Sequence, residues 1–109
     1  MSAEKRSEQG VRELGGLDRV IHEPGRLMVV AILYAAKKAD FLYLRRQTGL
    51  TGGNLSSHMS KLEEAGYIEV VKAFKDKRPN TMLKLTRLGR AAFQMYREQM
   101  LNMLGTIPD

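Results

Sequence analysis

Two short helix patterns, followed at once by a strand–turn–strand pattern, occupy the segment from residue 40 to residue 85. Asp40 can cap a helix that contains Leu42 and Leu44, and Gly49 can end this helix in the left-handed conformation that a residue without a side chain adopts easily. A tight turn then leads to a second helix. Few folds accommodate this order of elements.

The second helix is predicted over residues 51–65, because Thr51 is a good N-cap and Gly66 lies just past the end. One stripe of it repeats at helical spacing and should face the core: Leu55, Met59, Leu62 and Ala65. The opposite face carries polar side chains, namely Asn54, Ser57, His58 and Lys61.

A β-hairpin is predicted next. Residues 67–75 are rich in Tyr, Ile, Val and Phe, residues 76–80 form a charged turn cluster, and residues 81–85 return as the second strand. Thr86 then caps a final helix from Arg87 to about Leu104, on which apolar residues recur at helical spacing.

The N-terminal part is less regular. Residues 1–16 mix charge, Ser and Gly, so we expect a mobile arm. Residues 17–21 place three apolar groups on one short helical face, and Pro24 suits the first turn of a mostly apolar helix over about 24–37. We therefore expect one domain over 17–104 and a short tail over 105–109.

Composition restricts the function. The chain has 18 Lys and Arg against 12 Asp and Glu, which favours polyanionic partners. It has no cysteine, no nucleophile or phosphate-loop motif and no cluster of His with carboxylates, so we expect no enzyme, metal site or other cofactor. The apolar run 27–36 is too short to span a membrane and the N-terminus is polar, so a cytoplasmic protein is expected.

The sequence also resembles a known family. LTGGNLSSHMSKLEEAGYIEV (50–70) is similar to the recognition helix and first wing strand of MarR/ArsR-type regulators, and DKRPNTMLKLTRLGR (76–90) to their wing tip, second wing strand and following helix cap. The resemblance extends over about 17–100. It implies a mainly α (α+β) winged helix-turn-helix with a C-terminal dimerisation helix, which binds double-stranded DNA as a homodimeric transcription regulator and represses.

The candidate DNA-binding residues follow from the same segments. Asn54 can bond an adenine edge, Lys61 can reach guanine or phosphate, and Gly52 and Gly53 let backbone amides approach a phosphate. The full set is Arg45, Arg46, Thr51, Gly52, Gly53, Asn54, Ser56, Ser57, His58, Lys61, Lys75, Lys77 and Arg78.

Simpler explanations exist for several of these residues. The two glycines can simply shape the turn, His58 can be an uninvolved solvated residue, and charges at a hairpin tip often only keep a protein soluble. The main alternative function is a winged helix that binds another protein and not DNA.

Apolar residues near both ends exceed the needs of one core, which suggests pairing of two chains. The candidate dimerisation residues are Leu17, Val20, Ile21, Phe93, Tyr96, Met100, Leu101, Met103 and Leu104. Packing of the last helix against the first segment within one chain is the alternative.

Overall fold

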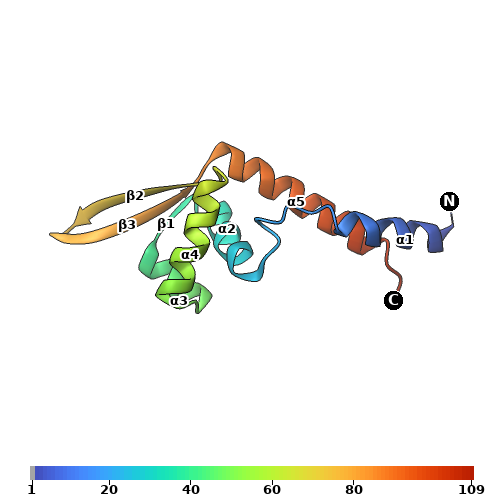
Figure 1. The fold of residues 1–109 in the computed structure, drawn as a ribbon, viewed down its shortest axis with the longest axis horizontal. Coiled ribbons are helices and arrows are strands. Elements are labelled where there is room, and N and C mark those ends of the chain that lie inside the picture. Colours follow the sequence, from blue (N-terminus) through green and yellow to red (C-terminus); the bar gives the residue numbers. More distant parts are fainter. Residues whose placement is uncertain (1) are drawn as a thin grey trace.

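The computed structural model describes residues 2–109 and has five helices and a three-stranded sheet (Figure 1). The helices are α1 (Ala3–Leu14), α2 (Pro24–Ala36), α3 (Phe41–Thr48), α4 (Gly52–Glu64) and α5 (Arg87–Gly105). The strands are β1 (Lys38–Asp40), β2 (Ile68–Lys75) and β3 (Arg78–Leu85). The mainly α fold class with a winged hairpin and a C-terminal helix is confirmed.

The sheet is antiparallel in the order β1-β3-β2. Strand β1 was missed from the sequence because its three residues are too few to show an alternating pattern. It pairs Ala39 with Leu83 at the base of the hairpin, so that α2 and α3 are joined to the wing by backbone hydrogen bonds.

The main core lies between α2, α3, α4 and the base of the hairpin. Its centre is fully buried and consists of Val29, Val30, Leu33, Leu44, Leu55, Leu62 and Leu83. Helix α2 contributes three of these residues, as its apolar sequence predicts for a helix covered on several sides. This core holds α3 and α4 in fixed positions.

The predicted helix caps are present. Asp40 accepts the Tyr43 N–H at 2.7 Å, Thr51 accepts the Asn54 N–H at 3.1 Å and Thr86 accepts the Gly89 N–H at 3.0 Å. Gly49 and Gly66 have positive φ angles of 73° and 80° after the ends of α3 and α4. These caps fix where α3, α4 and α5 start and where α3 and α4 end.

Residues 15–23 form turns, and the short helix expected over 17–21 is absent. Asp18 Oδ1 accepts the N–H groups of Val20 and Ile21, so a side chain replaces the hydrogen bonds of a helix. Leu17 and Ile21 still point inward, where they form a second core with Tyr96 and Met103 of α5.

A helix, α1, occupies most of the segment expected to be a mobile arm, and it packs along the end of α5 (Figure 1). Ser2 caps it, and the Ser7 hydroxyl donates to the Thr106 carbonyl at 2.6 Å. Gly10 permits this approach, because a Cβ there would lie 2.2 Å from Thr106 Oγ1 and 3.1 Å from the Met103 carbonyl. The prediction of a mobile arm considered only large apolar side chains and did not take account of close backbone packing at a glycine.

Candidate nucleic-acid interface

Helices α3 and α4 form a helix-turn-helix joined by residues 49–51. Thr48 stabilises the junction, since its hydroxyl donates to the Leu44 carbonyl and accepts the Leu50 N–H. Leu55 and Leu62 are fully buried, so one face of α4 is anchored in the core. The opposite face of α4 is presented to solvent.

The exposed face of α4 carries small and hydrogen-bonding residues. On a helical wheel the positions opposite the buried stripe are Gly53, Ser57, Ser60, Lys61 and Glu64, and all five are exposed. Asn54 is also exposed, on the flank toward α2. Ser60 was absent from the sequence-derived set; its hydroxyl donates to the Ser56 carbonyl at 3.1 Å.

Positive charge surrounds the start of α4. Arg45 and Arg46 lie in the last turn of α3. Together with Thr51 and neighbouring residues they line an open hollow of about 470 Å³. A Cβ added to Gly52 would lie 3.8 Å from Arg45 Nη1, which places this guanidinium beside the first turn of α4. Cations next to free helix N–H groups make a suitable site for a phosphate.

The structure brings no atom within 4 Å of a Cβ added to Gly53. Its φ angle is also not in the left-handed region, so the fold itself does not require glycine here. Gly53 leaves the backbone bare on the exposed face of α4. This observation favours the ligand explanation over turn shaping for Gly53.

The wing extends well beyond the helices (Figure 1). Its turn is shorter than predicted: only Asp76 and Lys77 form it, with φ angles of 53° and 65°, and residues 78–80 belong to β3. Positive φ at both positions is the requirement of the hairpin turn whose twist matches that of paired strands. The expected charges Lys75, Lys77 and Arg78 are all exposed at this tip, and Lys75 lies directly opposite Arg78.

One face of the wing continues the surface of α4. Ile68 and Val70 face the helices, and the alternation of a strand puts Lys72 and Phe74 on that same side. An open groove of about 360 Å³ lies between the two elements, lined by Ser56, Ser60 and Glu63 from α4 and by Lys72 and Thr81 from the wing, among others. The polar helix face and Lys72 of the wing therefore border one groove.

Phe74 was not among the sequence-derived candidates, yet its side chain is 78% exposed. It pairs across the strands with Pro79, so an apolar pair lies just before the charged turn. The signal available in the sequence was a large aromatic residue close to the charged turn of the predicted hairpin.

His58 lies against α2, and not on the open polar face where it was expected. Its Nδ1 is 3.4 Å from Glu23 Oε2 and 3.3 Å from Arg26 Nη1, and the side chain is only 18% exposed. The ring also covers Gly25, where a Cβ would lie 2.4 Å from Nε2. His58 therefore joins α4 to the start of α2, which leaves it poorly placed for a base contact.

Glu23 organises this junction. Its carboxylate accepts the N–H groups of Gly25 and Arg26 at the N-terminus of α2. Burial alone would raise the pKa of Glu23, but these two hydrogen bonds and the nearby His58 and Arg26 lower it below its ordinary value. Arg26 in turn donates to the Val20 carbonyl at 2.5 Å, so the 15–23 turns are tied to the helix-turn-helix.

The candidate dimerisation residues divide into buried, partly buried and exposed groups. Leu17, Ile21, Tyr96 and Met103 are buried within the chain, so they do not offer a free surface in one protomer; Val20, Phe93 and Met100 are partly buried. Leu101 and Leu104 remain 65% and 49% exposed, and Val11 of α1 is 57% exposed. For residues 17–21 the structure thus shows the alternative given in the sequence analysis, packing of the last helix against the first segment within one chain.

Among residues 2–109 the structure has no group of three or more metal-ligating side chains and no helix long and apolar enough to cross a membrane.

The arrangement of α3, α4 and the β2–β3 hairpin defines the class of winged helix-turn-helix proteins. Residues 26–104 match the family model of the winged helix DNA-binding domain, and the chain belongs to this family. Solved structures that share this fold include transcriptional regulators.

The chain is 35% identical over 85 residues to an uncharacterized protein of Methanocaldococcus jannaschii, a match that covers 78% of this chain and 92% of that protein. A transcriptional regulator homologue from Pyrococcus horikoshii OT3 superposes with a TM-score of 0.81 at 26% identity, covering 89% of this chain and 95% of the other. A MarR-family transcriptional regulator from Silicibacter pomeroyi has the same fold, with a TM-score of 0.60 at 19% identity and coverage of 94% and 64%. The MarR-like resemblance read from the sequence is thereby confirmed.

Proposed function

We propose that this protein is a cytoplasmic homodimer that binds double-stranded DNA sequence-specifically and represses transcription by occupying the site. The observation that supports this best is the shared surface of α4 and the wing, since both elements present polar or basic side chains around one groove. The family to which the chain belongs is one of DNA-binding domains.

In this proposal α4 enters the major groove with its N-terminal half. Asn54 and Ser57 reach base edges, whereas Lys61 contacts a base or the backbone. The bare backbone at Gly53, the free N–H groups of the first turn and Arg45 hold a phosphate at the groove edge. Thr51 and Gly52 shape and cap that turn.

The wing contacts the adjacent minor groove and its phosphates. Lys75, Lys77 and Arg78 supply the positive charge, and the two-residue turn gathers them at the tip of the wing. Contacts of this kind strengthen binding to every sequence and do not by themselves distinguish one sequence from another.

Two chains pair through the end of α5 and the outer face of α1. The apolar side chains that one chain leaves exposed there include Val11, Leu101, Leu104 and Ile107. Pairing would present two α4 helices to half-sites separated by about 10 base pairs or a multiple of that spacing.

The test is a fluorescence titration of the protein against random and genomic-promoter DNA at two salt concentrations. We expect tight binding to some promoter fragments and affinity that falls steeply with salt, because phosphate contacts release counterions. Failure to bind any DNA at low salt would contradict the proposal and favour a winged helix that binds protein.

A further inference from the structure

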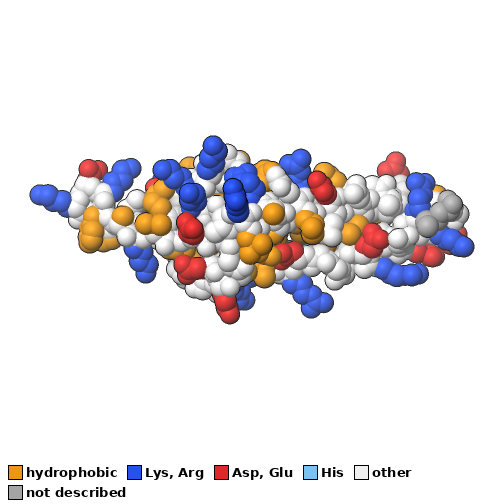
Figure 2. All heavy atoms as spheres, turned by 90° about the horizontal axis from the view of Figure 1, so that it is seen from above, with side chains coloured by type: hydrophobic (Ala, Val, Ile, Leu, Met, Phe, Trp, Pro, Cys, Tyr) orange, Lys and Arg blue, Asp and Glu red, His pale blue; other side chains and the backbone are white. Residues whose placement is uncertain are grey.

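A second concentration of positive charge lies away from the helix-turn-helix. Figure 2 views the molecule from the side opposite α3 and shows Lys and Arg side chains gathered over the base of the wing and the start of α5. The proposed DNA surface does not account for these charges.

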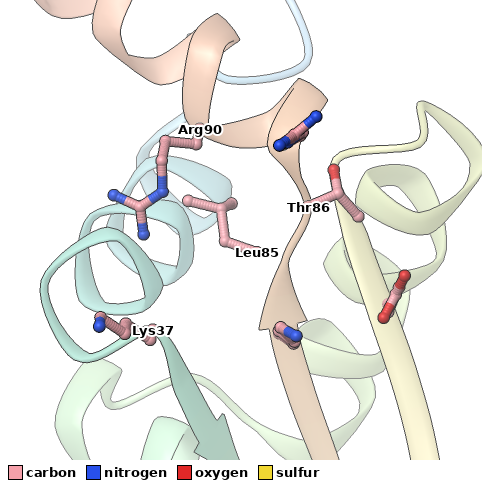
Figure 3. A pocket seen from close by; sticks show the side chains of 7 residues that line it. Lys37, Leu85, Thr86 and Arg90 are labelled. Atoms are coloured by element: carbon pink, nitrogen blue, oxygen red, sulfur yellow. The ribbon is translucent and has the colours of Figure 1, made fainter.

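They surround an open hollow of about 520 Å³, here named the basic hollow. Its charged lining residues are Lys37, Lys84, Arg87, Arg90 and one acid, Glu69; Leu85 and Thr86 complete it. Figure 3 shows Arg90 from α5, Lys37 from the junction of α2 and β1, and Leu85 and Thr86 from the end of β3 arranged around it. The volume is in the range of small-molecule sites.

The basic hollow opens away from α4. Lys84 pairs with Glu69 across the two strands. The residues on either side of them, Leu83 and Leu85 in β3 and Ile68 in β2, are buried in the core that α4 packs against. Because side chains alternate along a strand, Lys84 and Glu69 must point to the opposite face. DNA held by α4 therefore does not cover this site.

Arg90 is positioned in advance by aromatic side chains. Its Cζ lies 4.6 Å from the centre of the Tyr34 ring, and that ring packs on Phe93 with 4.9 Å between centroids. The Tyr34 hydroxyl accepts a hydrogen bond from Gln94, which fixes the ring from its other end. The guanidinium is thus half-buried and oriented, so an incoming ligand need not order it.

Within residues 2–109 none of these cations forms an ion pair. The ion pairs found within residues 2–109 all involve Glu23, far from the hollow. Glu69 can offset one of the four positive charges, so the lining keeps a net charge of +3 (four cations less one acid). Several like charges around one hollow repel each other, and a bound polyanion would relieve that repulsion.

We propose that the basic hollow binds a free small molecule that carries two or more phosphate groups, such as a nucleoside polyphosphate. Arg90 and Arg87 offer planar forks that match phosphate oxygens, and Lys37 and Lys84 add compact charges. A monovalent carboxylate would neutralise only one of these cations. The site lies where the wing, α2 and α5 meet, so its ligand can be bound together with DNA.

The experiment is calorimetric titration of the full chain with inorganic pyrophosphate and with ATP, in buffer without Mg²⁺ or DNA. We expect saturable binding of one ligand per chain. Arg87→Gln with Arg90→Gln should weaken it by about tenfold or more, since two charge-assisted contacts are lost. Lys77→Gln with Arg78→Gln removes the same charge at the wing tip and should change the affinity by less than about twofold.

Three results would overturn the proposal. Absence of binding at low salt is one. Equal weakening by both double variants is another, because it would indicate diffuse attraction to a basic protein. The third is a loss of DNA affinity in the Arg87/Arg90 variant as large as in the wing variant with pyrophosphate binding unchanged, which would assign the charges to the DNA backbone.

Amide chemical shifts of the wild-type protein test the basic hollow without relying on a variant that must fold. Pyrophosphate should shift the resonances of residues 84–90, and shifts confined to the start of α4 would contradict the site. The calorimetric titration and the chemical shifts are both measured without DNA. The site can therefore be confirmed if the protein does not bind DNA, and DNA binding can be confirmed if the site is absent.

Discussion

At the scale of single residues, replacing Gly53 should change stability and DNA affinity in opposite directions. Glycine in a helix costs about 0.5–1 kcal/mol relative to alanine, and nothing lies within 4 Å of a Cβ placed at this position. Gly53→Ala should therefore raise the free energy of unfolding in a urea titration. It should also lower DNA affinity in an anisotropy titration, because the methyl group meets the phosphate.

Gly105→Ala is the control, and both variants are measured on DNA with a single half-site so that pairing through the end of α5 does not contribute. A Cβ at Gly105 would also meet no atom, and the residue lies far from the proposed DNA surface. DNA affinity that is the same in both variants would mean that the backbone at Gly53 does not contact DNA.

Tyr67 gives a prediction about pH. Its hydroxyl donates to Asp18 Oδ2 at 2.5 Å, and burial, followed by this carboxylate, raises the pKa of Tyr67 from 10.0 to about 12. Because the pKa is higher in the folded chain, the stabilisation is complete below about pH 10 and is lost as the pH rises through about 12. Tyr67→Phe should be less stable by about 1–2 kcal/mol at neutral pH.

The measurement is urea unfolding of both proteins at pH 8 and at pH 11. The stability difference between wild type and Tyr67→Phe should shrink at the higher pH. An unchanged difference would show that the hydroxyl contributes through packing and not through its bond to Asp18.

Phe74 tests whether the wing makes apolar contacts with DNA. It lies on the wing face that continues α4, whereas Val71, 53% exposed, points to the other face. Apolar side chains of minor-groove proteins pack against sugars and base steps. Phe74→Ala should lower DNA affinity by roughly threefold to tenfold without changing the salt slope, because no charge is removed. An equal loss in Val71→Ala would refute a specific contact.

At the scale of elements, the sequence predicted the helices α3, α4 and α5 from capping residues and glycines at their ends. Asp40, Thr51 and Thr86 gave the starts of α3, α4 and α5, and Gly49 and Gly66 gave two ends. These helix ends depend on residues that are close in the sequence, so the sequence alone can predict them.

The missed elements depend on contacts between distant residues. Strand β1 exists because β3 offers it hydrogen-bond partners, and α1 is placed by Gly10 lying against the end of α5. His58 shows the same limit for the site: the helical wheel placed it on a polar flank, but only the structure brings Glu23 and Gly25 to that flank. Asn54, Ser57 and Lys61, by contrast, are exposed as expected.

The wing and the recognition helix should contribute differently to binding. Lys77→Ala with Arg78→Ala removes two cations from the wing tip and should weaken binding to every DNA sequence, with a salt slope smaller by about 1.8, or about 0.9 for each lost phosphate contact. Asn54→Ala should instead reduce the preference among sequences. Titrations against the best promoter fragment and against random DNA, each at several salt concentrations, measure both effects. If both variants altered sequence preference equally, this division of roles would be incorrect.

At the scale of the whole molecule, the shape is elongated, with principal extents of 63 × 26 × 21 Å. The wing forms one end and the paired α1 and α5 form the other (Figure 1). The second core of Leu17, Ile21, Tyr96 and Met103 joins this extension to the helix-turn-helix. A pairing surface at the far end would therefore fix the distance between two recognition helices through rigid elements.

Exposed apolar residues near the end of α5 allow this pairing to be tested. Leu101→Glu with Leu104→Glu places two charges on the proposed surface and should yield a monomer in sedimentation or light-scattering measurements, since burying unpaired charge is costly. Loss of the second recognition helix should weaken binding to DNA with two half-sites by about 100-fold, because the two contacts no longer act together.

Asn102→Glu is the control, because it adds charge to the same turn on another flank and removes no apolar surface. Binding to a single half-site should be unchanged in all three proteins, which would show that the α4 surface is intact. A Leu101/Leu104 variant that remains dimeric would show that the pairing surface lies elsewhere on α1 and α5. The spacing of the half-sites would then follow from that other surface.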